Sequence, residues 1–379
     1  MELGFSDEQM LLADTIRRLC EDSFTLRDLR EVEGTEPGFP RSFWDALIEL
    51  GFAGAAIPQT AGGVGLAALD LVAIYEQFGR ALVSSPHHVS SILAAELLGS
   101  TAEHSLTQAW LAGISEGRIV MTVASIEPGG DFSRAGVRVR AEREGDNYLL
   151  YGEKHFVPFA GSADAIIVFA RTVQDQIIGL VVDSQTPGLE RSIQRNLAAE
   201  PHSLLRFERV VVPSARALLG GADIWDHWQR VMFGGIIPLA AQAVGAANRV
   251  HEIAVAYSKE RHAFGRAIGG FQAIAHYLAD AIVAIEGCRT LVHQAAWARD
   301  KGLPFHALAA MAKLKAGAML QQTSALAIQV HGGLGYTTAA DPQLFFRRAK
   351  QWQVLNWDES CLEGHIADLC LGEVGSLDV

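Results

Sequence analysis

A stretch of alternating residues in the middle of the chain decides the fold. Residues 136–158 read GVRVRAEREGDNYLLYGEKHFVP, in which apolar and polar side chains alternate on both sides of the short EGDN at 144–147. Alternation with a period of two predicts half-buried β-strands, and a polar turn containing glycine between two such runs predicts a hairpin. The same period holds from about residue 119 to residue 222, so we expect a β domain over 119–222.

The sequences on both sides of this β region have the period of helices. Residues 6–24 read SDEQMLLADTIRRLCEDSF, in which Ser6 is expected to cap the N-terminus of a helix. Residues 223–379 form long helical runs with few prolines. The sequence therefore predicts an α+β protein with an N-terminal helical domain (1–118), a middle β domain (119–222) and a C-terminal helical domain (223–379).

Composition limits the classes of function. The chain has 31 basic and 43 acidic residues, a formal charge of −12, which opposes binding to nucleic acid or to an anionic membrane surface. The N-terminal MELGFSDEQM has no basic start followed by an apolar core, as a signal peptide would. The longest apolar run, MFGGIIPLAAQAVGAA at 232–247, is too short for a membrane span and is expected to form a buried helix. We expect a cytoplasmic protein with no membrane or nucleic-acid partner.

No set of residues predicts a metal site. Four cysteines lie far apart without a CxxC pair, which indicates reduced thiols rather than disulfides or zinc ligands: Cys20, Cys288, Cys361 and Cys370. His87 and His88, in SSPHHVSS, have no carboxylate or cysteine at ligand spacing, and we expect them in a surface turn.

Several segments together resemble one known family. Residues 257–281, YSKERHAFGRAIGGFQAIAHYLADA, resemble the RxxFGxxIxxFQxxxHxLA stretch of acyl-CoA dehydrogenases, and QVHGGLGYTT at 329–338 resembles their QxxGGxGY stretch. The same family is matched, in order, by IPQTAGGVGL at 57–66, EPGG at 127–130 and GEKHFVPFAG at 152–161. The resemblance covers essentially the whole chain. It implies an N-terminal helical domain, a middle β-barrel or sandwich domain and a C-terminal four-helix bundle.

Desaturation of an acyl thioester removes a proton from the α-carbon and a hydride from the β-carbon, so it needs a base and a flavin. The resemblance implies that FAD is contacted by six residues, the first three reaching a neighbouring subunit: Arg261, Phe264, Gln272, Gln329, Gly332 and Gly333. A guanidinium suits the FAD pyrophosphate, and glycines let backbone N–H groups approach it closely. The alternative is structural: Arg261 caps a helix and the glycines turn the chain.

The sequence departs from the family where the catalytic base is expected. Counted from RRAK at 347–350, the position of the usual glutamate is Asn356, and the alternative position found in some members is Gly235. Neither residue takes a proton, so we predict no catalytic residue in this chain. Asp358 and Glu359 follow closely, and a shifted register would recruit one of them as the base.

The positions expected around the flavin ring have also changed. Where the family commonly has tryptophan and threonine, this chain has Phe156 and Pro158, and Ile126 stands where a threonine precedes EPG. Pro158 offers neither a hydroxyl nor a backbone N–H. The serine usually found after EPG is deleted, since EPGG runs directly into Asp131.

This combination predicts a chain that completes the site of a partner. It is similar to the base-lacking subunit of the paired dehydrogenases that actinobacteria use on steroid side chains joined to coenzyme A. The expected partners are a catalytic dehydrogenase subunit in an α2β2 tetramer, an acyl-CoA substrate and electron-transfer flavoprotein. Three alternatives stay open: an independent flavoenzyme with monooxygenase-like chemistry, a homomeric dehydrogenase with a shifted base, and a scaffold with vestigial flavin residues.

Overall fold

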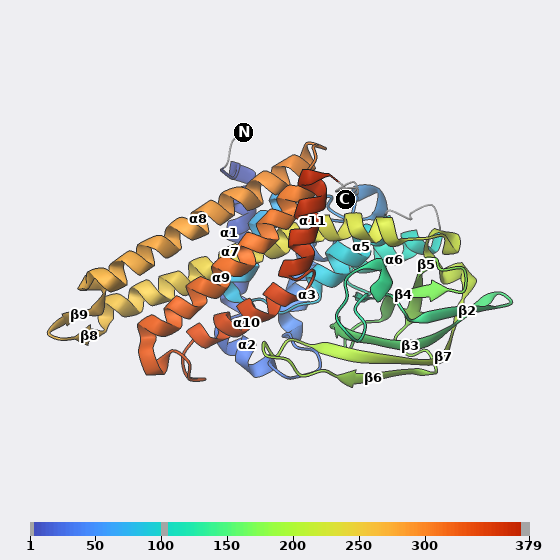
Figure 1. Ribbon diagram of the computed structural model, residues 1–379, viewed down its shortest axis with the longest axis horizontal. Coiled ribbons are helices and arrows are strands. Elements are labelled where there is room, and N and C mark those ends of the chain that lie inside the picture. Colours follow the sequence, from blue (N-terminus) through green and yellow to red (C-terminus); the bar gives the residue numbers. More distant parts are fainter. Residues whose placement is uncertain (1–3, 100–104, 373–379) are drawn as a thin grey trace, which may run out of the picture. The chain divides into compact units, whose positions relative to one another are not determined.

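The computed structural model describes residues 4–99 and 105–372 (Figure 1). Its α-helices are α1 (Asp7–Ser23), α2 (Leu26–Val32), α3 (Arg41–Glu49), α4 (Ala68–Ala81), α5 (Ala95–Gly99), α6 (Ser105–Ser115), α7 (Trp225–Glu260), α8 (Gln272–Asp300), α9 (His306–His331), α10 (Pro342–Val354) and α11 (Glu359–Leu371). Its strands are β1 (Met121–Ala124), β2 (Arg140–Glu144), β3 (Asn147–Pro158), β4 (Ala165–Thr172), β5 (Ile177–Asp183), β6 (Leu189–Ile193), β7 (His202–Pro213), β8 (His262–Ala263) and β9 (Arg266–Ala267). The order of helices, strands and helices confirms the predicted α+β class.

The chain divides into two compact units. The helical unit comprises residues 4–29, 67–83 and 236–372 among the described ones. The β unit comprises residues 30–66 and 84–235, without the undescribed 100–104. The division falls inside α7, so that helix belongs to both units.

The β unit is built around a seven-stranded mixed sheet. The strand order is β1-β4-β2-β3-β7-β6, with β5 paired to β4. β2 and β3 are antiparallel and pair Glu144 with Asn147, which confirms the hairpin predicted at EGDN. Alternate side chains of β3, such as Tyr148 and Leu150, enter an apolar core with Ile166 of β4. The period of two thus places one face of β3 in this core, whereas β4 and β5 are buried on both faces.

The helical unit depends on close approach between α4 and α7. A Cβ at Gly79 would lie 1.9 Å from the Gln242 carbonyl oxygen, and a Cβ at Gly245 would lie 1.8 Å from that of Glu76. Only glycine allows two helix backbones to touch at this distance. At the start of the unit, Ser6 accepts a hydrogen bond from the Gln9 backbone N–H, which confirms the predicted N-cap of α1.

Helix α7 contains the long apolar run. It is the only described helix that is long and apolar enough, by length and composition, to cross a membrane. In its most apolar window of 18 residues, 89% of the residues are buried. This confirms that residues 232–247 form a buried helix.

Candidate functional site

Two of the family-like segments meet at one end of the helical unit. Tyr257, in the last turns of α7, stacks on His331, the last residue of α9, with ring centroids 4.0 Å apart and planes inclined by 21°. Arg261 lies one helical turn after Tyr257, and its backbone N–H donates to the Tyr257 carbonyl at 2.8 Å. Gly332 follows His331 directly. The stacked pair therefore brings the arginine of one segment and the glycines of the other to the same end.

The predicted FAD residues at this end are exposed. Phe264 is 96% exposed in the short β8–β9 connection between α7 and α8, and its φ of +52° is left-handed. Gln272, the first residue of α8, and Gln329, near the end of α9, are also exposed. No residue among 4–99 and 105–372 makes a hydrogen bond or ion pair with the Arg261 guanidinium. The side chains of this set therefore point to solvent rather than into the fold of their own chain.

The two positions expected for a catalytic base lie in different secondary structure, one in a turn and the other inside a helix. Asn356 lies in the turn between α10 and α11, with φ +53°, and Trp357 after it has φ +71°. Gly235 lies in α7, where an added Cβ would be 2.3 Å from Leu93 Cδ2. A carboxylate side chain at position 235 would therefore require Leu93 to move.

The histidine pair lies beside this part of α7, and the prediction of a surface turn is wrong. His87 is buried, with its Nε2 2.9 Å from the Phe52 carbonyl oxygen, and burial lowers its pKa to about 4. His88 is half-buried at the start of a π-helical segment (His88–Ala94), and its Nε2 lies 2.9 Å from the Gly235 carbonyl oxygen. Both imidazoles are hydrogen-bonded to backbone carbonyl oxygens, and a sequence motif does not reveal such contacts. No group of metal-ligating side chains is found in the described part of the chain.

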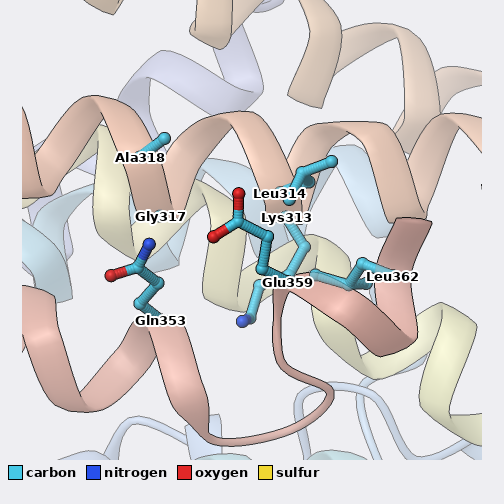
Figure 2. A pocket seen from close by; sticks show the side chains of 7 residues that line it. All are labelled: Lys313, Leu314, Gly317, Ala318, Gln353, Glu359 and Leu362. Carbon is cyan, nitrogen blue, oxygen red and sulfur yellow. The ribbon is translucent and has the colours of Figure 1, made fainter.

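The two carboxylates after Asn356 have different environments. Asp358 is the N-cap of α11, and its Oδ1 accepts from the Cys361 backbone N–H at 2.9 Å. Glu359 is exposed and lines a small pocket with Lys313 and Gln353 (Figure 2). The carboxylate of Asp358 is thus engaged in capping, whereas that of Glu359 faces solvent.

In the β unit, the residues expected around a flavin ring lie at the C-terminal end of β3 and in the segment that follows β1. The His155 backbone N–H donates to the Ile126 carbonyl at 2.9 Å, which places Ile126 beside Phe156. Phe156 has φ +49° and is 40% exposed, and its own N–H donates to Gln194 Oε1. Pro158 has no N–H, and its carbonyl accepts from Thr122. The backbone N–H groups of His155 and Phe156 therefore already donate hydrogen bonds within the chain.

A buried ion pair involves Lys154, which lies two residues before Phe156 in β3. Lys154 Nζ is 2.6 Å from Glu127 Oε1, and the exposed fractions of the two side chains are 0% and 5%. Glu127 also accepts from the backbone N–H groups of Arg138 and Val139. The pair joins the EPGG segment, strand β3 and the loop before β2. The sequence did not predict this pair, although both residues lie within the quoted family-like segments.

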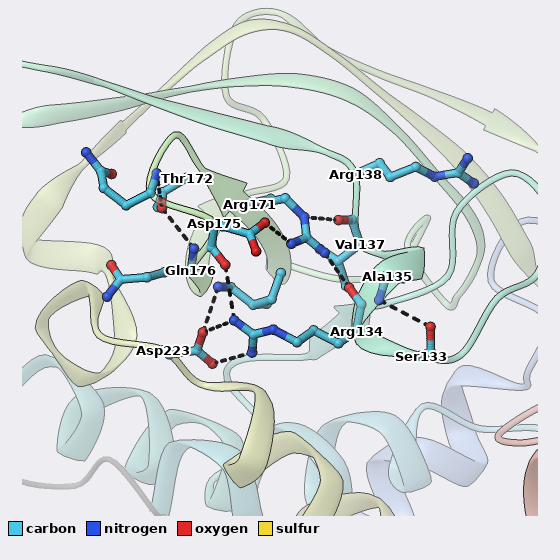
Figure 3. A network of polar contacts seen from close by, with 12 residues as sticks. Ser133, Arg134, Ala135, Val137, Arg138, Arg171, Thr172, Asp175, Gln176 and Asp223 are labelled. Atoms are coloured by element: carbon cyan, nitrogen blue, oxygen red, sulfur yellow. Dashed lines mark hydrogen bonds and ion pairs between the residues drawn. The ribbon is translucent and has the colours of Figure 1, made fainter. Parts of the chain in front are cut away.

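A second polar network fixes the loop that follows EPGG (Figure 3). Arg134 makes a bidentate ion pair with Asp223, which also accepts from the backbone N–H of Ile177. The hydrogen bond from Arg134 lowers the pKa of Asp223 to about 2. Arg171 donates to the backbone carbonyls of Arg134 and Val137. The loop therefore keeps a defined form although the usual serine is absent.

Family models match the chain in three consecutive parts. The N-terminal, middle and C-terminal domains of acyl-CoA dehydrogenase match residues 6–118, 122–210 and 233–356. The probable acyl-CoA dehydrogenase YngJ of Bacillus subtilis is 31% identical over 330 residues, which cover 83% of this chain and 86% of YngJ. The chain belongs to the acyl-CoA dehydrogenase family.

Solved structures agree closely with the fold. The ChsE4-ChsE5 complex from Mycobacterium tuberculosis includes a chain with a TM-score of 0.89 and 26% identity, covering 99% of this chain and 100% of that one. A steroid acyl-CoA dehydrogenase variant, Tcur3481-Tcur3483, gives a TM-score of 0.84 and 28% identity, covering 97% of this chain and 98% of that one. The first is a complex of two proteins, and the name of the second joins two protein designations.

Acyl-CoA dehydrogenases bind FAD, and this chain fits that cofactor in one place better than in another. At the exposed end of the helical unit, the Arg261 guanidinium bonds to none of the residues that the structure describes, and a Cβ at Gly332 or Gly333 would meet nothing within 4 Å. This leaves room for a ligand to approach the backbone. At the C-terminal end of β3 in the β unit, Phe156 and Pro158 offer few hydrogen-bond donors to a flavin ring.

Proposed function

We propose that this chain is the base-lacking subunit of a heteromeric FAD-dependent acyl-CoA dehydrogenase. The observation that carries the proposal is the exposed Arg261 guanidinium, which has no partner in the described part of its own chain. The two positions at which the family carries a base are occupied by Asn356 and Gly235. A chain with free cofactor donors and no base is suited to complete a site that lies mainly in another subunit.

Each retained residue has a role in this proposal. Arg261 would bind the pyrophosphate of FAD with a bidentate fork, with Phe264 and Gln272 reaching the same partner. Gln329 would contribute its amide, and Gly332 and Gly333 their backbone N–H groups. Bound FAD supplies the acceptor for the hydride that leaves the acyl β-carbon. The carboxylate that removes the α-proton would come from the partner, and electron-transfer flavoprotein would then receive the electrons.

The proposed substrate is a steroid side chain joined to coenzyme A. The likeness to the steroid acyl-CoA dehydrogenase pair supports this choice. The likeness to the ChsE4-ChsE5 complex supports an assembly of two different chains, which we propose to be an α2β2 tetramer.

Titration of FAD into the complex tests the role of Arg261. Each charge-assisted hydrogen bond is worth roughly 1.5–3 kcal/mol, so Arg261→Ala should weaken FAD binding by about ten- to a hundredfold or more. Arg261→Lys should restore part of the affinity, because an ammonium keeps the charge and loses the fork. Arg266→Ala is the matched control, since Arg266 is exposed in the same connection and stacks over Phe271 at 4.0 Å. Equal FAD affinity in all three variants and the unaltered complex would contradict the proposed role of Arg261 in binding FAD.

A flavin reduction assay tests whether this chain itself contains a catalytic base for removal of the α-proton. The purified chain, mixed anaerobically with FAD and either butyryl-CoA or a steroid acyl-CoA, should not bleach the flavin. A missing general base costs on the order of 10² to 10⁴ in rate. Rapid bleaching by the chain alone would contradict the proposal. If Glu359→Gln then abolished that bleaching, the exposed Glu359 would be the shifted base.

A further inference from the structure

The turn between α10 and α11 has an unusual backbone. Asn356 and Trp357 are consecutive non-glycine residues with φ of +53° and +71°. Left-handed φ is unfavourable for residues with a Cβ, and asparagine tolerates it better than tryptophan. Such a conformation persists only where the surroundings hold it. The residues that hold this turn must therefore lie outside it.

One buried side chain contacts the backbone on both sides of Asn356. Lys313, in the middle of α9, is 4% exposed. Its Nζ donates to the carbonyl oxygens of Trp352 at 2.9 Å, Leu355 at 3.2 Å and Trp357 at 3.4 Å. An ammonium has three N–H donors, so three acceptors satisfy it fully.

The position of the charge is also favourable. The carbonyls of Trp352 and Leu355 belong to the C-terminal end of α10, where a helix stabilises a cation. Burial lowers the pKa of Lys313 to about 8, against the attraction of Asp358. The amine is therefore mostly protonated at neutral pH and keeps all three donors.

We propose that Lys313 is the positioning residue of this turn: its ammonium holds Asn356 and Trp357 in the left-handed form and fixes where the side chain at position 356 leaves the backbone. Position 356 is where the family resemblance expects the catalytic base. This chain thus keeps the turn that would position the base, but the side chain at position 356 is an amide and not a carboxylate. The proposal concerns the turn alone and does not depend on a partner or on FAD.

Hydrogen exchange of the segment 353–362 in the full-length chain measures the turn. Lys313→Met, which keeps an unbranched side chain one atom shorter and removes its donors, should speed exchange there by at least about tenfold. The Leu355 and Leu362 amides report on the two sides of the turn, because they donate to the Gln351 and Asp358 carbonyls. Unchanged exchange in this segment would overturn the proposal.

A glycine rescue distinguishes positioning from simple packing. Glycine adopts left-handed φ without strain, so Asn356→Gly should recover several-fold of the protection lost in Lys313→Met and change the unaltered chain by less than about twofold. The control is Asp175→Gly, because Asp175 also has a left-handed φ of +65° but is exposed in the β4–β5 turn. It should give no rescue. Absence of rescue by Asn356→Gly, or equal rescue by Asp175→Gly, would contradict the role.

Two further variants keep the test decisive. If the Met variant does not fold, Lys313→Gln, which retains two donors, should show the same rescue with a smaller initial loss. Asn356→Glu should speed exchange of 353–362 by a few-fold at most, well below the effect of Lys313→Met, because glutamate tolerates left-handed φ less well than asparagine while Lys313 still holds the turn. An increase as large as that in Lys313→Met would show that the residue at position 356, and not Lys313, sets the turn, and would overturn the proposal. None of these outcomes bears on FAD binding by Arg261, so this proposal and the proposed function fail separately.

Discussion

Removal of Lys154 should destabilise the β unit far more than removal of a neighbouring surface cation. Lys154→Met leaves the Glu127 carboxylate buried without its cation, which lies 2.6 Å away with no exposed surface. Breaking one partner of a buried pair costs about 3–5 kcal/mol. Glu127 keeps the backbone N–H donors of Arg138 and Val139 at 2.9 and 3.0 Å. The loss should therefore fall near the lower end, about 3 kcal/mol.

The assay is urea unfolding of the full-length chain followed by fluorescence. With a slope of about 2 kcal/mol/M, a loss of about 3 kcal/mol lowers the midpoint by about 1.5 M. The matched control is Arg206→Met. Arg206 pairs with Glu153, the residue before Lys154, but this pair lies on the surface with Nε–Oε1 of 2.9 Å. Surface pairs contribute little, so the control should leave the midpoint within experimental scatter.

A double variant tests the cause of the loss. Glu127→Gln with Lys154→Met removes both charges, and the glutamine oxygen still accepts from the two backbone N–H groups. This variant should recover most of the stability lost in Lys154→Met, because no buried charge is left unpaired. Two results would show that an unpaired Glu127 carboxylate is not the cause of the loss. One is that Lys154→Met lowers the free energy of unfolding no more than Arg206→Met does, and the other is that the double variant is as unstable as Lys154→Met.

Three other properties can be measured on the same protein. The ordinary pKa of Asp223 is 3.8 and the folded value is about 2, so its stabilising effect is complete above about pH 4 and is lost as pH falls towards 2; Asp223→Asn should remove this part of the acid sensitivity of urea unfolding. Gly245→Ala should cost about 1–3 kcal/mol or more because its Cβ meets a carbonyl at 1.8 Å, whereas Gly287→Ala, with nothing within 4 Å, should stabilise α8 by about 0.5–1 kcal/mol; urea midpoints that do not separate the two would be contrary to the close helix crossing. A thiol reagent at pH 8 should label the exposed Cys370 quickly and spare Cys20, whose pKa burial raises to about 12; equal labelling of both would show that Cys20 is not buried in solution.

Local patterns predicted those features of the fold that depend on neighbours in sequence. The EGDN hairpin follows from the period of two and a glycine turn, and the α1 cap follows from Ser6 at the start of a helical run. The prediction for His87 and His88 failed because their burial depends on the packing of residues far away in sequence, such as Phe52 and Gly235.

The candidate site was predicted unevenly for the same reason. Arg261 and Phe264 belong to a contiguous motif, and the structure places them together at an exposed end. Their contact with FAD stays a prediction. The pair of Glu127 and Lys154 and the contacts of Lys313 join residues 27 to 44 positions apart, and no local period links them. Such buried charges become recognisable only when the fold brings their partners together.

Native mass spectrometry with a count of bound FAD shows whether this chain completes the FAD site of a partner subunit. The chain should be expressed alone and together with candidate partner chains that carry the family glutamate. We expect little FAD on the chain alone and an α2β2 tetramer holding two FAD molecules with the partner. A homotetramer of this chain that holds four tightly bound FAD molecules would contradict it.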